Sequence, residues 1–269
     1  MIYDVMYNIL ITALGGDIAQ GILKAIKLFT PESRIVGTDK YPSSAGLFTC
    51  QKAFVIRPTA GENARLYVER IGEICNTEKI DIAFIGHEAE QAAIARHHDY
   101  LSNITSTYFV VQHANVLQLC SDKFATYNFL QKKDIRVPET YIDLVDAEKL
   151  IKKFGFPIVI KPRQGCGSRG FHLVNGHDEL EKYWQEDVAP MIQEYITNGQ
   201  GEENRGEEYT VGIFLDKNSK ALGAIPMLRQ LRFGLTWHAF VDDYPDIAET
   251  AIQAAEAVGA VGPCNVQLR

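Results

Sequence analysis

The first part of the chain alternates short apolar runs with stretches that are apolar at every third or fourth position. The apolar runs predict buried strands over residues 8–13, 34–38, 53–56, 80–85 and 108–111. Helical spacing follows the first run, where Ile18, Ile22 and Ile26 recur, and helices are also predicted over residues 62–76 and 88–97. Because strands and helices take turns, we expect a parallel sheet covered by helices on both faces.

Beyond about residue 119 the predicted helices are short, and capping residues, glycines and a proline mark where they begin and end. They are predicted over residues 122–131, 146–155, 177–186 and 245–259. Ser121 and Asp146 are the predicted N-caps of the first two. Gly155 and Gly259 mark C-terminal ends, and Pro245 fits the first turn of the last helix.

The same region predicts antiparallel hairpins. Residues 158–162 and 170–174 flank a glycine-rich loop, and a second pair of strands, over 208–215 and 221–227, flanks a polar turn. Further short strands are predicted over residues 141–142, 191–195 and 265–269. The polar, glycine-rich segment 197–206 predicts a mobile loop.

The predicted fold class is α/β. A Rossmann-like domain with a parallel sheet is expected over residues 1–118. Two α+β subdomains with antiparallel sheets are expected to follow, one over residues 119–190 with the glycine-rich loop and one over residues 191–269.

The composition of the chain argues against several classes of partner. The net charge of -7 argues against a nucleic-acid partner, because neutralising a phosphate backbone needs clustered lysine and arginine. The five cysteines form no CxxC pair, which is typical of free thiols in a reducing cytosol. We see no apolar run long enough to cross a bilayer and no signal peptide at the start, so we expect a cytoplasmic protein without a membrane partner.

The strongest chemical signal is the segment IVIKPRQGCGSRG over residues 158–170. On a strand, Lys161 lies on the face opposite Ile158 and Ile160, so its ammonium can point away from the core. The glycine-rich loop can bring backbone N–H groups close to phosphate oxygens. It lacks the GK[ST] of a Walker A motif, and a hairpin tip without a ligand is the alternative interpretation.

Two weaker signals lie on either side. Lys123 follows a predicted helix start, where the helix dipole favours a phosphate. Asn265, Gln267 and Arg269 alternate with apolar residues and therefore share one strand face. The amide oxygen of Gln267 suits Mg²⁺ beside substrate phosphates. Taken singly, Lys123 is more typical of a solvated first-turn lysine, and one amide is a poor metal site, because such sites usually also use carboxylates.

Together these segments resemble the ATP-grasp superfamily, closest to the branch of the carbamoyl phosphate synthase large chain. The matching motifs, in order, are SDKFATYNFL, FGFPIVIKPRQGCGSRG, MIQEYI, EEYTVGIFLD and GPCNVQ. The stretch NILITALGGDIAQGILKAI resembles the pre-ATP-grasp domain of that branch. The resemblance covers nearly the whole chain and implies that ATP lies between two antiparallel sheets.

The resemblance also implies site residues. The implied nucleotide-binding set is Lys123, Lys161, Gly165, Gly167, Ser168, Gly170, Gln193, Glu194, Ile196 and Glu208. In it the lysines and the loop meet the phosphates, Glu208 meets the ribose, and adenine is met by Gln193, Glu194 and Ile196. Gln267 is implied as a magnesium ligand. Arg229 and Arg232 are implied to stabilise an acylphosphate through their planar guanidinium groups.

The implied activity is that of an ATP- and Mg²⁺-dependent ligase. ATP would convert a carboxylate or bicarbonate to an acylphosphate, which an amine or another nucleophile attacks. The family pattern continues after NVQ with a strand that carries a Glu and then an Asn-x-Arg, whereas this sequence stops at Arg269. We therefore expect the magnesium site to need residues from a longer chain, a homodimer or a partner chain.

Two other functions stay open at this point. One is an ATP-binding module without complete chemistry. The other is an NAD(P)-dependent oxidoreductase, because ALGGDIAQG follows a strand and Asp39 ends the next one. Its glycines, at positions 15, 16 and 21, do not fit G-x-G-x-x-G. The histidines at positions 87, 97 and 98 are more typical of solvated side chains than of metal ligands.

Overall fold

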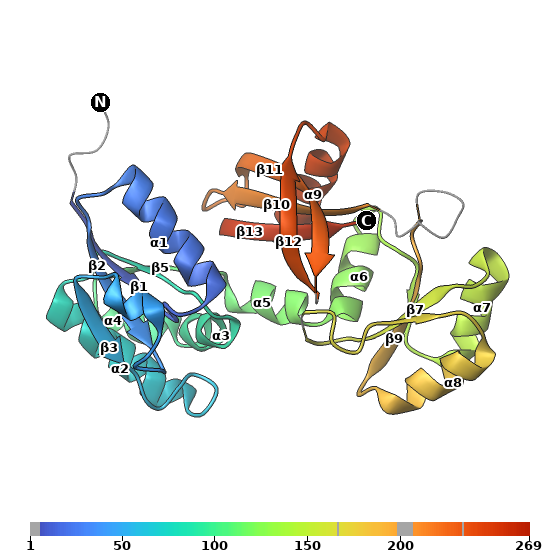
Figure 1. Ribbon diagram of the computed structural model, residues 1–269, viewed down its shortest axis with the longest axis horizontal. Coiled ribbons are helices and arrows are strands. Elements are labelled where there is room, and N and C mark those ends of the chain that lie inside the picture. The colour runs from blue at the N-terminus through green and yellow to red at the C-terminus, as the bar shows by residue number, and fades with distance from the viewer. Residues whose placement is uncertain (1–5, 166, 198–206, 233) are drawn as a thin grey trace. The chain divides into compact units, whose positions relative to one another are not determined.

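The chain divides into two compact units, residues 1–114 and 115–269 (Figure 1). The computed structural model describes residues 6–165, 167–197, 207–232 and 234–269. The boundary expected at residue 118 falls within helix α5 (Ala114–Ser121), which belongs almost entirely to the second unit. None of the helices that the structure describes has both the length and the apolar character that a bilayer-spanning helix requires.

The first unit is built on the expected parallel sheet, with its five strands in the order β3-β2-β1-β4-β5. The strands β1 to β5 span Asn8–Ile11, Arg34–Asp39, Lys52–Val55, Ile82–Phe84 and Tyr108–Val110. The helices α1 to α4 span Asp17–Phe29, Ala64–Glu78, Glu88–Arg96 and His98–Ile104, with a 3-10 turn, η1, at Ala45–Phe48. The single helix expected near residues 88–97 is thus followed directly by a second one.

Alternate residues of this sheet face two separate cores. Leu10 and Val36 pack with side chains of α2, α3 and α4. Their neighbours Ile9, Ile11 and Ile35 pack with side chains of α1 instead. Because both faces are buried, the strands are apolar at nearly every position, which is why the sequence pattern located them.

The second unit opens with α5 and α6 (Lys123–Gln131) and contains two antiparallel sheets. In the smaller one the strands have the order β6-β9-β7-β8. They span Thr140–Tyr141 (β6), Ile158–Pro162 (β7), His172–Val174 (β8) and Pro190–Glu194 (β9). Helices α7 (Leu144–Phe154) and α8 (His177–Glu186) cover one face, where Leu150 and Leu180 pack with Ile158 and Ile160.

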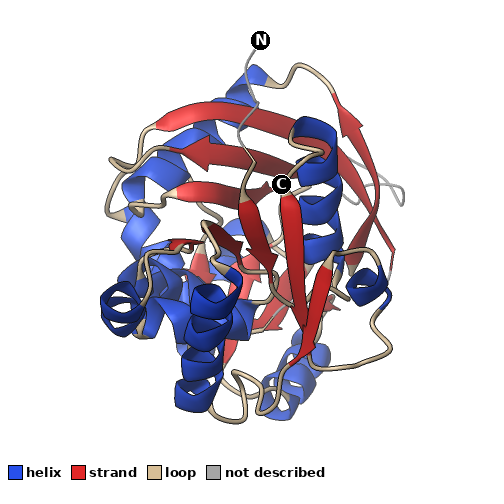
Figure 2. Ribbon diagram, turned by 90° about the vertical axis from the view of Figure 1, so that its left-hand side faces the viewer, coloured by secondary structure: helices blue, strands red, loops and turns tan. Residues whose placement is uncertain are grey.

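The larger sheet has the order β12-β11-β10-β13. Its strands span Glu208–Leu215 (β10), Ala221–Arg232 (β11), Leu235–Val241 (β12) and Gly262–Leu268 (β13). Helix α9 (Pro245–Ala257) covers one face, where Ala251 and Ala255 pack with Val211 and Ile213. Figure 2 distinguishes the strands, in red, from the helices, in blue.

The structure differs from the predicted elements in three places, and one further prediction lies largely outside the described residues. The boundary expected at residue 190 falls in β9, which pairs with β6 and β7 and so belongs to the smaller sheet. Strand β12 was not predicted, because its exposed edge position imposes no alternation of apolar and polar residues. The N-caps are Asp122 and Asp143 rather than Ser121 and Asp146, since α5 already extends to Ser121. Of segment 197–206, only Thr197 lies within the described residues.

Candidate functional site

Lys161 lies on the face of the smaller sheet that α7 and α8 leave uncovered. Ile158 and Ile160 point into the core beneath those helices, so the alternation of the strand places Lys161 on the opposite side. On that side its Nζ donates a hydrogen bond to Oε1 of Gln193, at 2.7 Å. The Gln193 amide in turn donates to Thr140 Oγ1, at 2.8 Å, so the acceptor for Lys161 is itself held in place.

The environment of Lys161 favours an anion. Burial, together with the charges of Lys123 and Arg269, lowers the pKa of Lys161 to about 8, and the charge of Glu208 acts in the opposite direction. Its one hydrogen-bond acceptor among the described residues is a neutral amide. A desolvated ammonium next to two other cations is stabilised when a negatively charged group enters.

Four polar side chains gather on the uncovered face of the larger sheet. Strand pairing sets Glu208 opposite Arg229, and the pairing of β13 with β10 brings Gln267, and Arg269 just after β13, to the same end of the sheet. The Glu208 carboxylate forms ion pairs with Arg229 and Arg269, and each guanidinium Nη2 lies 3.3 Å from a carboxylate oxygen. Arg229 Nη2 also donates to Oε1 of Gln267, at 3.1 Å.

Arg269 connects the two sheets of this unit. Its guanidinium lies 4.8 Å from the centre of the Tyr195 ring, a cation–π contact with the residue that follows β9. The same guanidinium pairs with Glu208 of β10 and acts on the pKa of Lys161 in β7. Lys161, Glu208 and Arg269 therefore surround one place between the two uncovered faces.

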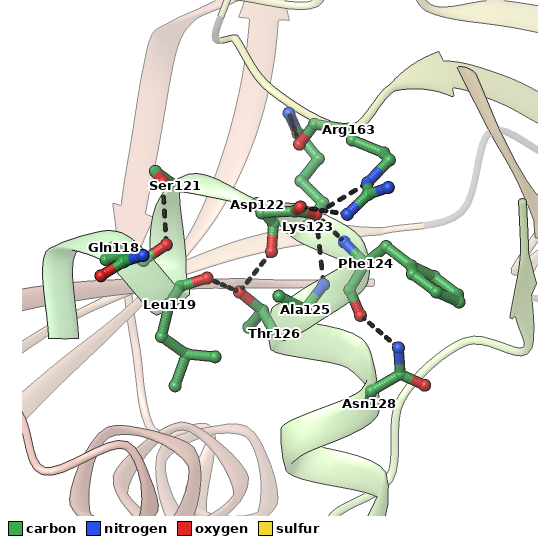
Figure 3. Close-up of polar contacts among 10 residues, drawn as sticks. All are labelled: Gln118, Leu119, Ser121, Asp122, Lys123, Phe124, Ala125, Thr126, Asn128 and Arg163. Carbon is green, nitrogen blue, oxygen red and sulfur yellow. Dashed lines mark hydrogen bonds and ion pairs between the residues drawn. The ribbon is translucent and has the colours of Figure 1, made fainter. Parts of the chain in front are cut away.

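The base of the glycine-rich loop is fixed by α6, as Figure 3 shows around Asp122. Asp122 caps the helix by accepting from the N–H groups of Phe124 and Ala125, and it also pairs with Arg163. The backbone N–H of Lys123 donates to the Arg163 carbonyl, at 2.9 Å. The Lys123 ammonium donates to the Gly165 carbonyl, also at 2.9 Å, so this lysine holds the loop from beneath.

The loop itself requires glycine at its turns. Gly165, Gly167 and Gly170 have positive φ angles of 107°, 68° and 70°, and Ser168 joins them at 55°. The loop meets the turn between β11 and β12, where a Cβ on Gly234 would lie 2.5 Å from the Gly167 carbonyl oxygen. Cys166 of the predicted loop lies outside the described residues.

The structure brings together part of the predicted residue set. Lys161, Gln193 and Glu208 converge, together with Arg229 and Gln267. Glu194, one position along β9 from Gln193, faces the other way, and its carboxylate accepts from the Glu139 N–H at 2.8 Å.

Arg232 and Ile196 are two further residues of the predicted set. Arg232 is exposed and stacks over the Trp237 ring, with 4.7 Å between the guanidinium carbon and the ring centre. Ile196 follows β9 and is half-buried. The sequence had placed Arg269 on the face of Gln267 without giving it a role, and nothing in the pattern indicated Tyr195.

The described residues do not assemble a metal centre by themselves. Within them, no three His, Cys, Asp or Glu side chains lie close enough to hold an ion. The Gln267 oxygen predicted to bind Mg²⁺ accepts a hydrogen bond from Arg229. The residues present therefore fit a polyphosphate, through Lys161 and the loop, better than they fit a metal ion alone.

Comparison with known proteins identifies the class. Residues 120–221 match the model of the ATP-grasp domain. A D-alanine–D-alanine ligase of Bacillus anthracis is 29% identical over 195 residues, which cover 66% of this chain and 60% of the ligase. That of Fusobacterium nucleatum is 31% identical over 109 residues, or 40% of this chain and 32% of the ligase. The chain carries an ATP-grasp domain, as its motifs predicted.

Solved structures agree on the fold. The biotin carboxylase domain of Hydrogenobacter thermophilus 2-oxoglutarate carboxylase has a TM-score of 0.71 and 17% identity, over 98% of this chain and 61% of that chain. N5-carboxyaminoimidazole synthetase of Staphylococcus aureus has a TM-score of 0.70 and 15% identity, over 97% and 65%. The first of these was solved with MgADP and bicarbonate.

These matches cover only part of each relative, so they do not show the activity of the whole relative for this chain. The chain spans about 60% of the length of the Bacillus anthracis ligase it matches. The carbamoyl-phosphate-synthase branch stays a prediction, since the relatives described here are D-alanine–D-alanine ligases. The oxidoreductase alternative gains no support from any of these proteins.

Proposed function

We propose that this chain binds ATP between its two antiparallel sheets and uses it, with Mg²⁺, to activate a carboxylate or bicarbonate as an acylphosphate for attack by an amine or another nucleophile. The observation that carries the proposal is the buried Lys161 ammonium, bonded to a neutral amide and flanked by cations. A nucleoside triphosphate supplies the negative charge that this arrangement accommodates.

Different residues of the site bind different parts of ATP. Lys161 is the phosphate contact, and Lys123 holds the loop whose glycines let backbone N–H groups approach the phosphate oxygens. Gln193 orients Lys161 and marks the strand that adenine would meet. Glu208 is the ribose acceptor once one of its two arginine partners gives way.

Arg229 is the better placed of the two predicted substrate arginines. It is largely buried, with 12% of its side chain exposed, and lies beside Glu208 and Gln267. A guanidinium there stabilises charge that develops on a transferring phosphoryl group. Bound Mg²⁺ would neutralise phosphate charge, with Gln267 as the ligand that this chain offers. A contribution from a second copy or another chain remains a prediction of the sequence.

A second candidate function is nucleotide binding without turnover. It is favoured by the engagement of Gln267 with Arg229 and by the lack of a metal cluster among the described residues. The two candidates share the nucleotide site and differ only in chemistry.

Titration calorimetry with ATP and a coupled ADP-release assay test the proposal together. The assay panel contains bicarbonate and free amino acids, with Mg²⁺ present. Saturable ATP binding with ADP release that depends on one of these substrates is the expected result. Binding without release across the panel would favour the second candidate, and no ATP binding at all would end both.

The Lys161 ammonium also predicts how ATP affinity depends on pH. In the protein without nucleotide this group loses its proton as the pH rises through about 8, because the pKa of Lys161 is lowered from 10.5 to about 8. A bound phosphate stabilises the charged form and raises that pKa again. ATP affinity should therefore fall above about pH 8, and Lys161→Arg should remove this step because an arginine stays charged.

Calorimetric Kd values at several pH values on both sides of 8 measure this dependence. The stability of the protein without nucleotide should change in the opposite sense. An unfolded lysine keeps its proton up to 10.5, so the folded state gains relative stability as the pH rises from about 8 to 10.5. An affinity profile identical in the wild type and in Lys161→Arg would contradict the assignment.

A further inference from the structure

Both oxygens of the Glu208 carboxylate already have cationic partners. Arg229 Nη2 lies 3.3 Å from Oε2 of Glu208, and Arg269 Nη2 lies 3.3 Å from Oε1. We call these three residues the Glu208 triad. The Glu208 side chain is only 25% exposed, so a ribose whose two hydroxyls donate to the carboxylate would meet the guanidinium groups at the same two oxygens. One arginine therefore has to move before the ribose can bind fully.

Arg229 is the arginine that stays in place. It lies in the middle of the sheet, where the pairing of β10 with β11 sets it opposite Glu208. Its Nη2 donates hydrogen bonds to Glu208 and, at 3.1 Å, to Oε1 of Gln267. Moving it would break both bonds in a position that is only 12% exposed, which is costly because the groups left behind are largely buried.

Arg269 is held in a way that lets its guanidinium turn. It contacts the Tyr195 ring, with 4.8 Å between the guanidinium carbon and the ring centre. A cation–π contact is less directional than a hydrogen bond, so the N–H groups can change direction while the guanidinium remains over the ring. Arg269 can therefore release Glu208 without leaving the space between the two sheets.

The position of Arg269 also brings it within reach of bound phosphate. Its charge lies close enough to Lys161 to lower the pKa of that lysine. A phosphate that pairs with Lys161 therefore attracts Arg269 as well and removes the repulsion between the two cations. A guanidinium binds phosphate oxygens through two parallel hydrogen bonds, and a triphosphate carries more negative charge than the single carboxylate of Glu208.

We propose that Arg269 makes recognition of the ribose depend on the phosphates. Without phosphate, Arg269 occupies Oε1 of Glu208, and a triphosphate draws the guanidinium away and frees this oxygen for a ribose hydroxyl. A nucleoside brings no charge, so it leaves the Glu208 triad closed and gains little from its ribose. Arg269 is thus a positioning residue that selects nucleotides over nucleosides. This inference rests on the proposed function, because it concerns the same nucleotide site.

The test measures a ribose factor, which is the Kd of a 2′,3′-dideoxy compound divided by the Kd of its parent. Calorimetry gives this factor for ATP, and NMR titration of backbone amides gives it for adenosine, which binds more weakly. In the wild type we expect a factor of about ten for ATP, since hydrogen bonds to a charged group are lost, and a factor near one for adenosine. Equal factors for ATP and adenosine in the wild type would overturn the inference.

Arg269→Gln opens the Glu208 triad without phosphate, because it removes one cation and leaves Glu208 paired with Arg229. Adenosine should bind this variant more tightly than it binds the wild type, with a ribose factor that rises to about ten. Arg269→Met, which is uncharged and keeps a long stem, takes its place if thermal unfolding shows that the glutamine variant is not folded. A purely structural role would weaken ATP and adenosine in parallel. That result, or a folded variant that binds no adenosine or shows no ribose factor for it, would refute the inference.

Arg65→Gln is the matched control, since Arg65 is an exposed arginine of α2 in the other unit. It removes the same charge and should keep the wild-type ribose factors. The two proposals can fail separately. If the wild type binds ATP but Arg269→Gln gains no ribose factor for adenosine, only the role of Arg269 falls, whereas a wild type that binds no ATP ends the proposed function as well.

Discussion

Replacing Lys161 with alanine should weaken ATP binding by roughly 10- to 100-fold, because a charge-assisted hydrogen bond to a phosphate is lost from a site with little water. The fold should remain intact. The ammonium is held by one neutral amide beside other cations, and its lowered pKa indicates that burial disfavours its charge. Calorimetric Kd values and a thermal unfolding curve measure the two effects separately.

The matched control for Lys161 is Lys217→Ala. Lys217 is an exposed lysine in the turn between β10 and β11, so its removal changes net charge by the same amount without touching the site. ATP affinity in this variant should equal that of the wild type. Equal affinities in Lys161→Ala and Lys217→Ala would remove the basis of the nucleotide assignment.

Replacing Gly234 with alanine should destabilise the second unit by about 1–3 kcal/mol and weaken ATP binding as well. Gly234 has a φ of 75°, which costs a residue with a Cβ about 1–2 kcal/mol. The added Cβ would also lie 2.5 Å from the Gly167 carbonyl oxygen and 2.8 Å from its carbon. Since backbone atoms are in the way, either the glycine-rich loop or the turn between β11 and β12 must move.

Denaturant unfolding and ATP titration of Gly234→Ala measure these two consequences. Gly223→Ala is the control, because Gly223 lies in β11, the strand that leads to this turn, and a Cβ there meets nothing within 4 Å. That variant should match the wild type in affinity and lose little stability. A Gly234→Ala protein with unchanged stability and affinity would show that the loop and the turn do not touch.

Much of the fold could be predicted because local patterns reflect burial. Strands buried on both faces, such as β1 and β2, appear as apolar runs, and the hairpin of β10 and β11 appears as two strands around a polar turn. Strand β12 escaped prediction because neither of its faces is covered, so Trp237 and Phe240 remain about half exposed and follow no pattern. The start of the larger subdomain was misplaced for a similar reason, since nothing within β9 reveals which strand it pairs with.

From the residues alone, strand alternation predicted on which face of its strand each site residue lies, but not which residues it contacts. Alternation placed Lys161 away from the core, and it placed Gln267 and Arg269 on one face. It could not show that Glu194 turns its carboxylate to the backbone of Glu139, because that contact depends on the pairing of β9 with β6. The resemblance to a family supplied the roles, and the geometry then separated Arg229, which joins the cluster, from Arg232, which stacks on Trp237.

The sequence by itself determined the order of most elements, the glycine-rich loop on its hairpin, and the side of the strand on which Lys161 lies. Only the tertiary structure decided that Arg269 pairs with Glu208 across the sheet and stacks on Tyr195, and that Gln193 holds Lys161. The physical reason is range. Periodicity records how each residue meets the core within its own element, whereas these contacts join residues tens of positions apart, and strand register and sheet packing fix them.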